Sequence, residues 1–284
     1  MMFNMSLPEP LNPGLYIVAT PIGNLGDLTP RAADTLCRAA LIAAEDTRVT
    51  AKLLRHIGST RPMTPYHDHN ADAVRPRLIA RMRGEAVALV SDAGTPLISD
   101  PGYKLVRDAR AAGIAVTTLP GPCAAIAAMT LAGLPTDRFL FAGFLPSKQG
   151  ARATAIEELK SLRATLVFYE SGPRLGTSLA ALGEILGPRP AAVAREISKK
   201  FEEVVDGDLP TLAARYADGG PKGEIVVIVG PPGEEAMATA DDLDAALAKA
   251  MAAAPLKTAV AEVAVALNLP RKQVYARALE LKGG

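Results

Sequence analysis

The chain has 284 residues, of which 49% are apolar and only 4% aromatic, and its net charge is +1. This length predicts two domains whose cores are packed mainly by alanine and small aliphatic side chains. The near-neutral charge excludes a globally basic nucleic-acid-binding protein, but it is compatible with a local basic surface.

The sequence lacks the features of secreted and membrane proteins. Its two cysteines, Cys37 and Cys123, show neither a disulfide framework nor the spacing of metal ligands. Residues 1–13 lack a basic segment followed by an apolar core, and no apolar run reaches the roughly 18–20 residues of a membrane span. We therefore expect a cytoplasmic protein that binds no membrane.

Apolar runs alternate with amphipathic segments through the first half of the chain. After a loose lead-in over residues 1–13, Thr29 and Pro30 are typical of a helix start. The apolar runs predict strands at residues 15–19, 41–44, 63–66, 86–90 and 114–118. Because helical patterns separate these strands, the sequence predicts a parallel α/β domain over residues 14–134.

A second α/β domain is predicted over residues 135–233, after a linker near residues 133–137. Its predicted strands lie at residues 139–143, 165–169, 191–194 and 224–229. The tail, residues 241–284, carries no strand signal. Two of its predicted helices are joined by a short turn, and the second begins with Arg271 and Lys272, so the tail resembles a helix-turn-helix.

The segment from Ser91 to Gly102 is the most informative part of the chain. It follows the buried strand at residues 86–90, and it is longer than the ordinary connections of about 2–6 residues. Ligands of open parallel sheets bind outside the carboxyl ends of the strands. The small residues of this loop would let a ligand approach the backbone. The competing interpretation is a stiff turn in which Ser99 or Asp100 caps the next helix.

Acidic and glycine-rich segments follow the first two strands. Residues 23–27 (Gly-Asn-Leu-Gly-Asp) and the pair Glu45 and Asp46 have the layout of a dinucleotide-binding unit. Neither the full G-x-G-x-x-G spacing nor a P-loop is present, so a pyrophosphate cradle is not indicated. A neutral or cationic ligand, such as an adenosyl sulfonium, would require carboxylates and backbone carbonyls instead.

Two further polar segments are candidates for function. His67 and His69 supply only two imidazoles and no third ligand, so we expect no metal there. We interpret these residues instead as a polar edge of the loop or as an RNA contact. A dense run of charges over residues 195–203 follows a predicted strand. Such runs are often solvated faces, but the position of this one at a strand end favours a functional site.

Together these motifs resemble one family. The sequence resembles the tetrapyrrole methylase-like superfamily of S-adenosylmethionine-dependent methyltransferases, and within it the members that methylate small-subunit ribosomal RNA. The matching stretches are residues 19–27, 45–48, 67–70, 91–103, 120–122, 141–146, 195–203 and 222–224. Two positions depart from the family pattern: the segment after the strand at 165–169 lacks a usual histidine, and Cys123 stands where serine is usual.

The resemblance implies two α/β domains with an S-adenosylmethionine cleft between them, usually in a homodimer. The implied substrate is a cytidine ribose in the decoding region of 16S ribosomal RNA, methylated at its 2′-oxygen. The positions that the resemblance assigns to the cofactor are Pro21, Asp92, Ala93, Gly94, Leu97, Ile98, Ser99, Cys123, Ala124, Phe144, Leu145, Tyr169, Ala194, Gly223, Glu224 and Ile225.

We hypothesise that Glu196 or Glu45, assisted by Lys199, takes the proton of the 2′-hydroxyl group. Candidate RNA contacts are Arg31, Arg48, His67, His69, Arg152, Arg174, Arg271 and Lys272. Two other functions fit the same fold: a methyltransferase of a tetrapyrrole-like acid, and a non-enzymatic RNA-binding module whose tail reads the RNA. We expect no binding to DNA.

Overall fold

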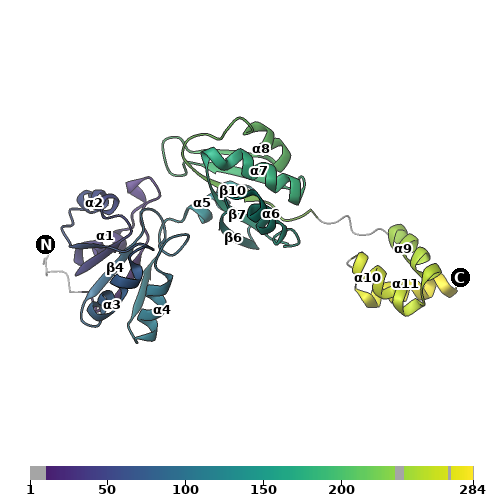
Figure 1. Cartoon of the computed structure of the whole chain (residues 1–284), viewed down its shortest axis with the longest axis horizontal. Helices are drawn as coiled ribbons and strands as arrows, with labels where there is room; N and C mark the ends of the chain where they lie inside the picture. Colours follow the sequence, from purple (N-terminus) through teal and green to yellow (C-terminus); the bar gives the residue numbers. More distant parts are fainter. Residues whose placement is uncertain (1–10, 234–239, 268–269, 284) are drawn as a thin grey trace, which may run out of the picture. The chain divides into compact units, whose positions relative to one another are not determined.

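The computed structural model describes residues 11–233, 240–267 and 270–283. The chain divides into two compact units, Met1–Pro231 and Pro232–Gly284. The first unit contains two five-stranded sheets, and the second contains helices (Figure 1). Most of the predicted lead-in (residues 1–10) and the predicted turn residues 268 and 269 lie outside the described residues. The domain boundaries expected from the sequence stay a prediction.

The first sheet is entirely parallel, as its alternating sequence pattern predicts. Its strand order is β3-β2-β4-β1-β5, so β4 lies at the centre between β2 and β1. Every residue of β2 and β4 is buried, which explains their continuous apolar runs. The strands are β1 (Gly14–Val18), β2 (Leu41–Ala44), β3 (Met63–Pro65), β4 (Ala86–Val90) and β5 (Val116–Leu119).

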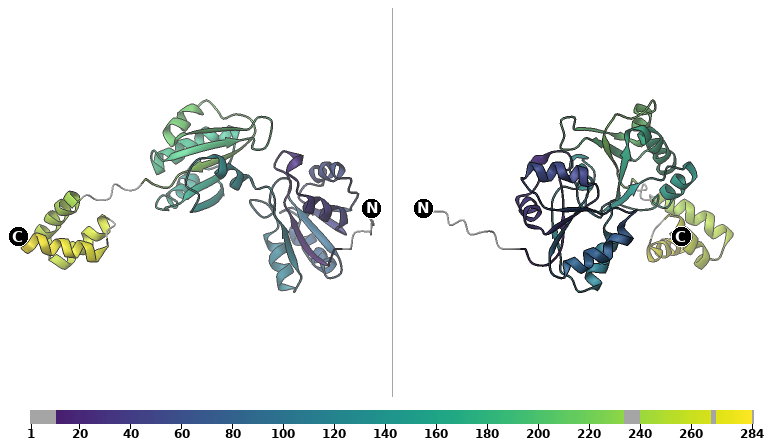
Figure 2. Two further views of the ribbon diagram at one scale, coloured as in Figure 1. Left: turned by 180° about the vertical axis from the view of Figure 1, so that it is seen from behind. Right: turned by 60° about the vertical axis from the view of Figure 1, so that its left-hand side comes forward.

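Helices cover both faces of this sheet (Figure 2). On one face, Leu36 and Leu53 pack with Ile42 of β2. On the other face, Leu78 and Leu105 pack against strand residues of the sheet. The helices are α1 (Pro30–Arg38) and α2 (Thr47–His56) on the first face, and α3 (Ala71–Met82) and α4 (Tyr103–Ala111) on the second. These two layers hold the strand ends, and therefore the loops that follow them, in fixed positions.

The second sheet is mixed, in the order β6-β7-β10-β8-β9. Strands β6 and β7 are parallel, whereas β10 runs antiparallel to both β7 and β8. Strand β9 was not predicted, because this edge strand is half-buried and its sequence, Glu-Val-Val-Asp-Gly-Asp, lacks a continuous apolar run. The strands are β6 (Phe139–Phe144), β7 (Thr165–Ser171), β8 (Pro190–Arg195), β9 (Glu203–Asp208) and β10 (Glu224–Val229).

One face of the second sheet carries a large aliphatic core, where Phe168 of β7 and Val227 of β10 pack with leucines of the covering helices. These helices are α6 (Gln149–Glu157), α7 (Gly172–Leu186) and α8 (Leu209–Arg215). The opposite face is covered by α5 (Ala124–Leu131), whose Ala125 and Ala128 pack with Val226. Helix α5 therefore packs on the second sheet, although it precedes the linker expected near residues 133–137.

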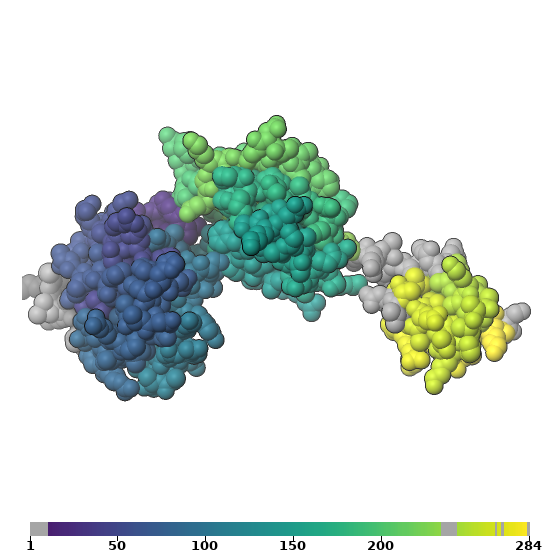
Figure 3. Space-filling view, in the orientation of Figure 1, coloured from purple at the N-terminus to yellow at the C-terminus, as the bar shows by residue number. Residues whose placement is uncertain are grey.

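The second unit, drawn in yellow-green to yellow in Figure 3, consists of helices and has its own core. Its helices are α9 (Ala240–Ala253), α10 (Leu256–Ala266) and α11 (Arg271–Gly283). Leu247, Val260 and Val274 are buried together at its centre. Arg277 of α11 binds Asp244 of α9 through two hydrogen bonds of 2.7 and 2.6 Å. The prediction of a helical tail that resembles a helix-turn-helix is confirmed. None of the helices in the described ranges is long and apolar enough to cross a membrane.

Candidate functional site

A cleft of about 420 Å³ opens at the carboxyl ends of β1, β2 and β4 and is closed from the other side by residues of the second sheet. Its volume lies within the range of small-molecule sites. Twelve of the sixteen positions assigned to the cofactor line this cleft: Asp92, Ala93, Gly94, Ile98, Ser99, Cys123, Ala124, Phe144, Tyr169, Gly223, Glu224 and Ile225.

Backbone hydrogen bonds join the loops that form the floor of the cleft. Thr20, after β1, exchanges two backbone hydrogen bonds with Gly94, at 2.8 and 3.0 Å. The hydroxyl of Thr95 donates to the carbonyl of Pro122, at 2.9 Å. The loops after β1, β4 and β5 are therefore fixed to one another before any ligand binds.

The long loop after β4 holds strained backbone at the edge of the cleft. Leu97 and Ser99 have positive φ angles of 75° and 63°, which are unfavourable for residues with a side chain. Gly102 forms the N-cap of α4 without a side-chain cap, with φ at 137°, and a Cβ atom there would lie 2.9 Å from Leu89. The interpretation of this loop as a turn capped by Ser99 or Asp100 is therefore wrong.

Three carboxylates line the first-sheet side of the cleft: Glu45, Asp92 and Asp100. The backbone N–H of Asp92 donates to Glu45 Oε2 at 3.2 Å, and the backbone N–H of Asp46 donates to Asp92 Oδ1 at 3.0 Å. These two bonds connect the ends of β2 and β4. Burial raises the pKa of Glu45 and of Asp92 above their ordinary values, and neighbouring carboxylates raise both further.

Asp100 is the most perturbed of the three. Burial raises its pKa to about 6, a hydrogen bond from Ser91 opposes the rise, and the charges of Glu45 and Asp92 add to it. The sequence pattern indicated a possible helix cap at this residue and did not place it in the site. The signal was its position in the same loop as Asp92, since both carboxylates follow one buried strand.

Lys199 is held by carboxylates on the opposite side of the cleft. Its ammonium group lies 2.9 Å from Glu196 Oε1 and 2.6 Å from Glu224 Oε2. Glu196 Oε1 also accepts the backbone N–H of Glu224, at 3.0 Å. Backbone hydrogen bonding from Glu224 and the contact with Lys199 lower the pKa of Glu196. Glu196, which does not line the cleft itself, therefore serves to position the other two residues.

The loop that carries Lys199 also contacts the first α/β half. A Cβ atom on Gly23, whose φ is 145°, would lie 2.4 Å from Lys199 Cε. Only glycine at this position therefore leaves room for the aliphatic part of the Lys199 side chain. The hydroxyl of Ser198 donates to Asp27. Glu196 and Ser198 both have positive φ angles, at 50° and 68°. Strained backbone thus flanks the cleft on both sides.

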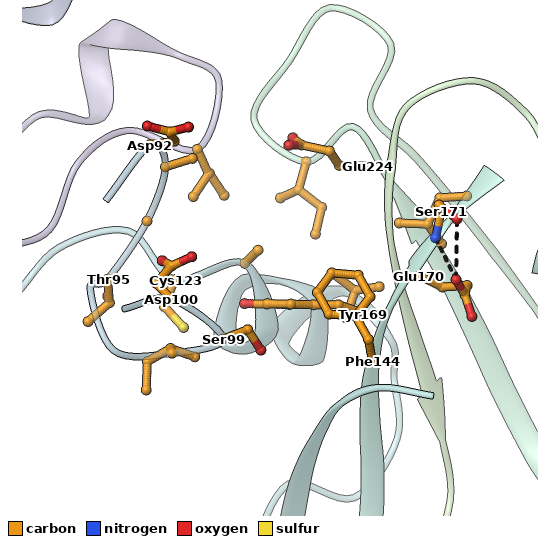
Figure 4. Close-up of a pocket in the computed structure, with 18 of the residues that line it drawn as sticks. Asp92, Thr95, Ser99, Asp100, Cys123, Phe144, Tyr169, Glu170, Ser171 and Glu224 are labelled. Carbon is orange, nitrogen blue, oxygen red and sulfur yellow. Dashed lines mark hydrogen bonds between the residues drawn. The ribbon is translucent and has the colours of Figure 1, made fainter. Parts of the chain in front are cut away.

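Aromatic and aliphatic side chains form the rest of the wall. Figure 4 shows Asp92 and Asp100 on one side of the cleft, and Phe144, Tyr169 and Glu224 on the other. The rings of Phe144 and Tyr169 meet edge to face, with centroids 5.6 Å apart. Burial raises the pKa of Tyr169 to about 12, so its hydroxyl remains protonated. These groups offer an apolar surface suited to a planar heterocycle.

Four positions assigned to the cofactor do not line the cleft. Leu145 and Ala194 are buried in the cores on opposite faces of the second sheet, because both side chains pack with its strands and helices. Leu97 packs against the core of the first sheet, and the buried Pro21 precedes the cleft residue Ile22. The cleft residues that sequence reasoning did not assign to the cofactor or to catalysis are Ile22, Thr95, Asp100, Glu170, Ser171, Ile197 and Val226.

Glu170 is a buried acid whose side chain is only 1% exposed. It accepts hydrogen bonds from the Ser178 hydroxyl at 2.5 Å and from the Ser171 backbone N–H at 2.8 Å, and Arg174 lies 3.5 Å away. Its carboxylate points away from the cleft (Figure 4). We therefore assign it a role in holding the start of α7 against β7.

The candidate RNA-binding residues divide into exposed and enclosed groups. Arg48, whose side chain is 87% exposed, pairs with Asp46 at 2.5 Å beside the cleft residue Glu45. By contrast, Arg152 is only 6% exposed, and Arg174 donates to the carbonyl of Leu145 at 2.5 Å. A phosphate contact from Arg152 does not fit the structure, because the protein already encloses its guanidinium group. The exposed candidates are Arg31, Arg48, His69, Arg271 and Lys272.

The side chain of His67 is half-buried, and its ring meets that of His69 with centroids 5.9 Å apart. Its Nδ1 atom is buried without a hydrogen-bond partner. Within the described part of the chain, no group of three or more histidine, cysteine, aspartate or glutamate residues is placed to hold a metal ion. A reaction without a metal stays a prediction.

The residues of the cleft fit S-adenosylmethionine. This donor carries a positive sulfonium, and the three carboxylates of the first-sheet side face the cleft without a cation among them. Its adenine matches the apolar wall of Phe144, Tyr169 and neighbouring aliphatic residues. No glycine-rich phosphate cradle is needed, because the donor has no phosphate.

Two family models match the chain. The description "Tetrapyrrole (Corrin/Porphyrin) Methylases" covers residues 14–213, and "RsmI C-terminal HTH domain" covers residues 237–282. The first match spans both sheets through β9, together with the cleft loops up to Lys199. The second spans the three helices of the tail.

Curated relatives match nearly the whole chain. The ribosomal RNA small subunit methyltransferase I of Erythrobacter litoralis is 56% identical over 96% of this chain and 97% of its own length. The protein of the same name from Mesorhizobium japonicum is 52% identical over 96% and 94%. A uroporphyrin-III C-methyltransferase from Thermus thermophilus, solved with S-adenosylhomocysteine, has the same fold, with a TM-score of 0.54 at 21% identity over 76% of this chain and 97% of that one.

Proposed function

This chain belongs to the tetrapyrrole methylase family and, within it, to the ribosomal RNA small subunit methyltransferase I group, and we propose that it methylates the 2′-oxygen of a cytidine in 16S ribosomal RNA. It is an S-adenosylmethionine-dependent methyltransferase. The observation that carries the proposal is the cleft, whose carboxylate side and aromatic wall suit this donor. S-adenosylmethionine supplies an activated methyl group, and the protein supplies its alignment with the acceptor.

Among the three residues considered for proton transfer, Glu45 is the best candidate base. Its raised pKa and its position in the cleft favour proton acceptance from a ribose hydroxyl. Glu196 has a lowered pKa and is occupied by Lys199. The pKa of Lys199 is raised by its two carboxylate partners, which outweigh its burial, so it stays protonated. We propose that Lys199 and Glu196 hold the residues around the cleft in place, and that Glu45 takes the proton of the ribose 2′-hydroxyl group.

Single-turnover kinetics of two matched variants test this assignment. We expect Glu45→Gln to slow methyl transfer from the bound donor, measured at saturating donor, by roughly 10²-fold, which is the size of contribution that general-base catalysis makes. Glu196→Gln removes a hydrogen-bonded carboxylate of the same size from outside the cleft lining, and it should weaken donor binding more than it slows the bound complex. A Glu45→Gln rate within twofold of the unmodified protein would rule out a base at this position.

Exposed basic residues supply the proposed RNA contacts. Arg48 and His69 lie at the ends of β2 and β3, beside the cleft residue Glu45, where the acceptor nucleotide would enter. Arg271 and Lys272 are exposed at the start of α11 in the second unit. Such contacts bind phosphates without reading sequence, so they would make RNA binding depend on salt.

We further propose that the chain acts as a cytoplasmic homodimer. Large apolar side chains are exposed on the helix that covers one face of the second sheet and on an edge strand of that sheet: Ile126 and Leu131 on α5, and Phe139 on β6. Exposed apolar groups of this kind are typical of protein interfaces. Light scattering of the full chain at micromolar concentration should give twice the mass of one chain. A mass equal to one chain would overturn the proposal.

Methyl transfer to different acceptors tests the proposed substrate. The full chain is incubated with S-adenosylmethionine labelled in its methyl group and with small ribosomal subunits from cells that lack the modification. Uroporphyrinogen III serves as the competing acceptor in a parallel reaction. We expect label in the RNA and none in the tetrapyrrole. Label in the tetrapyrrole alone would favour the small-molecule alternative.

A further inference from the structure

We propose that the carboxylates of Glu45, Asp92 and Asp100 make this cleft selective for positive charge, so that it holds S-adenosylmethionine more tightly than S-adenosylhomocysteine. The inference rests on the proposed function, because it assumes the methyl donor. It goes beyond that function because it names the residues that distinguish the methyl donor from the product that the donor becomes.

The charge balance of the cleft supports this inference. Of the cationic residues in the described ranges, only Lys199 lines the cleft, and two carboxylates outside the set, Glu196 and Glu224, already hold it. Arg48 is hydrogen-bonded to Asp46 at 2.5 to 3.1 Å, and its charge opposes the rise in the pKa of Asp92 without cancelling it. The carboxylate side of the cleft therefore keeps an excess of negative charge.

The surroundings of these carboxylates strengthen their attraction for a cationic ligand. Glu45 and Asp100 are half-buried and Asp92 is more exposed, yet desolvation is the largest cause of the raised pKa in all three cases. The opposing wall of Phe144, Tyr169 and Ile225 contains little polar surface to screen them. In such surroundings a fixed positive charge interacts more strongly with carboxylates than it does in water.

Methyl transfer removes the charge that these residues favour. The bond between the methyl carbon and sulfur breaks, and its electron pair stays on sulfur, which changes from a cationic sulfonium to a neutral thioether. A bond forms between the methyl carbon and the ribose oxygen, whose proton passes to a base. The cleft is thus matched to the donor before the reaction and faces a neutral sulfur after it, which favours release of the product.

The selectivity should depend on pH through the group with the highest pKa, Asp100. The other titratable and charged groups that line this region or act on its carboxylates are Glu45, Asp46, Arg48, Asp68, Asp92, Cys123, Tyr169, Glu170, Lys199 and Glu224. Protonation of Asp100 near pH 6 removes one of the three charges. Affinity for a cationic ligand should therefore fall as the pH is lowered through this region, while affinity for a neutral ligand should change less.

Calorimetric titration of the full chain with three ligands tests the proposal. They are S-adenosylmethionine, S-adenosylhomocysteine and sinefungin, which carries an amine in place of the methyl sulfonium. We expect the two cationic ligands to bind at least roughly tenfold more tightly than S-adenosylhomocysteine at about pH 7.5, and this ratio to shrink at about pH 5. Asp100→Asn should reduce the ratio by roughly tenfold and remove most of its pH dependence.

The matched control is Asp34→Asn, which removes a carboxylate from an exposed pair with Arg38 on α1 and should leave the ratio unchanged. If Asp100→Asn does not fold, the pH dependence of the three affinities in the unmodified protein still tests the proposal.

Equal affinity for all three ligands at both pH values would overturn the inference and leave the proposed function intact. Failure to bind any of them would instead contradict the proposed donor. Sinefungin that behaves like S-adenosylhomocysteine would show that the methyl group, and not the charge, is recognised.

Discussion

Replacing Asp100 by asparagine should stabilise the ligand-free protein at neutral pH. Asp100 is half-buried beside Glu45 and Asp92, and burial together with their charges raises its pKa from 3.8 to about 6. Asparagine has nearly the same shape and can keep a hydrogen bond with Ser91, but it carries no charge to desolvate or repel. The site thus holds a charge that favours ligand binding at the expense of stability, a common compromise in active sites.

The size of the effect follows from the pKa. A rise from 3.8 to about 6 sets a ceiling of about 3 kcal/mol on the destabilisation by the ionised carboxylate. Because solvent still reaches and screens this half-buried group, we expect only about 1 kcal/mol. For a unit of this size that corresponds to a gain in Tm of about 2–4 °C.

The pH dependence gives the prediction its sign. Since the pKa is higher in the folded state, the folded protein binds more protons than the unfolded chain between about pH 3.8 and pH 6. The destabilisation by the ionised Asp100 is therefore absent below about pH 3.8 and fully present above about pH 6. Thermal denaturation followed by circular dichroism should show a higher Tm for Asp100→Asn at about pH 7.5, and a smaller difference at about pH 4.5. An unchanged or lower Tm at about pH 7.5 would refute the reasoning.

Three further outcomes are expected. Gly23→Ala should displace Lys199 and lower donor affinity, measured by calorimetry, by roughly tenfold or more, whereas Gly113→Ala, at another positive φ with no atom within 4 Å of its Cβ, should not change that affinity. Glu170→Ala should lower the free energy of unfolding by about 2–4 kcal/mol in urea, because it leaves the Ser178 hydroxyl and the Ser171 backbone N–H without an acceptor and removes the carboxylate partner of Arg174. Replacing Arg271 and Lys272 together by alanine should reduce the slope of log K against log salt for RNA binding by about 1.4, and an unchanged slope would exclude phosphate contacts from this helix.

Much of the fold could be predicted because local patterns coincide with burial. The apolar run at residues 86–90 is β4, and every one of its residues is buried. Thr29 caps α1 by accepting the backbone N–H of Ala32 at 3.2 Å, and Pro30 opens that helix, as the pattern indicates. Strand β9 was missed because an edge strand with half-buried residues has no strong apolar signature.

The candidate site was predicted less completely, because its decisive interactions join distant parts of the chain. Nothing in the run of charges at residues 195–203 indicates that Lys199 packs over Gly23, or that Glu196 accepts the backbone N–H of Glu224. Asp100 was not recognised as a cleft residue, because its perturbed pKa depends on burial and on Glu45, which follows another strand, β2. Leu145 stands in one of the matching stretches and Ala194 directly before another, but both side chains pack into the cores.

The central claim is that this cleft methylates the ribose of a cytidine in small-subunit ribosomal RNA. The most direct measurement is mass spectrometry of nucleosides from small subunits treated with the full chain and S-adenosylmethionine carrying a deuterated methyl group. The account predicts that the deuterated methyl group appears in 2′-O-methylcytidine, and that Glu45→Gln strongly reduces this product. The methyl group on a base, or its absence from RNA when the donor is bound, would contradict the account.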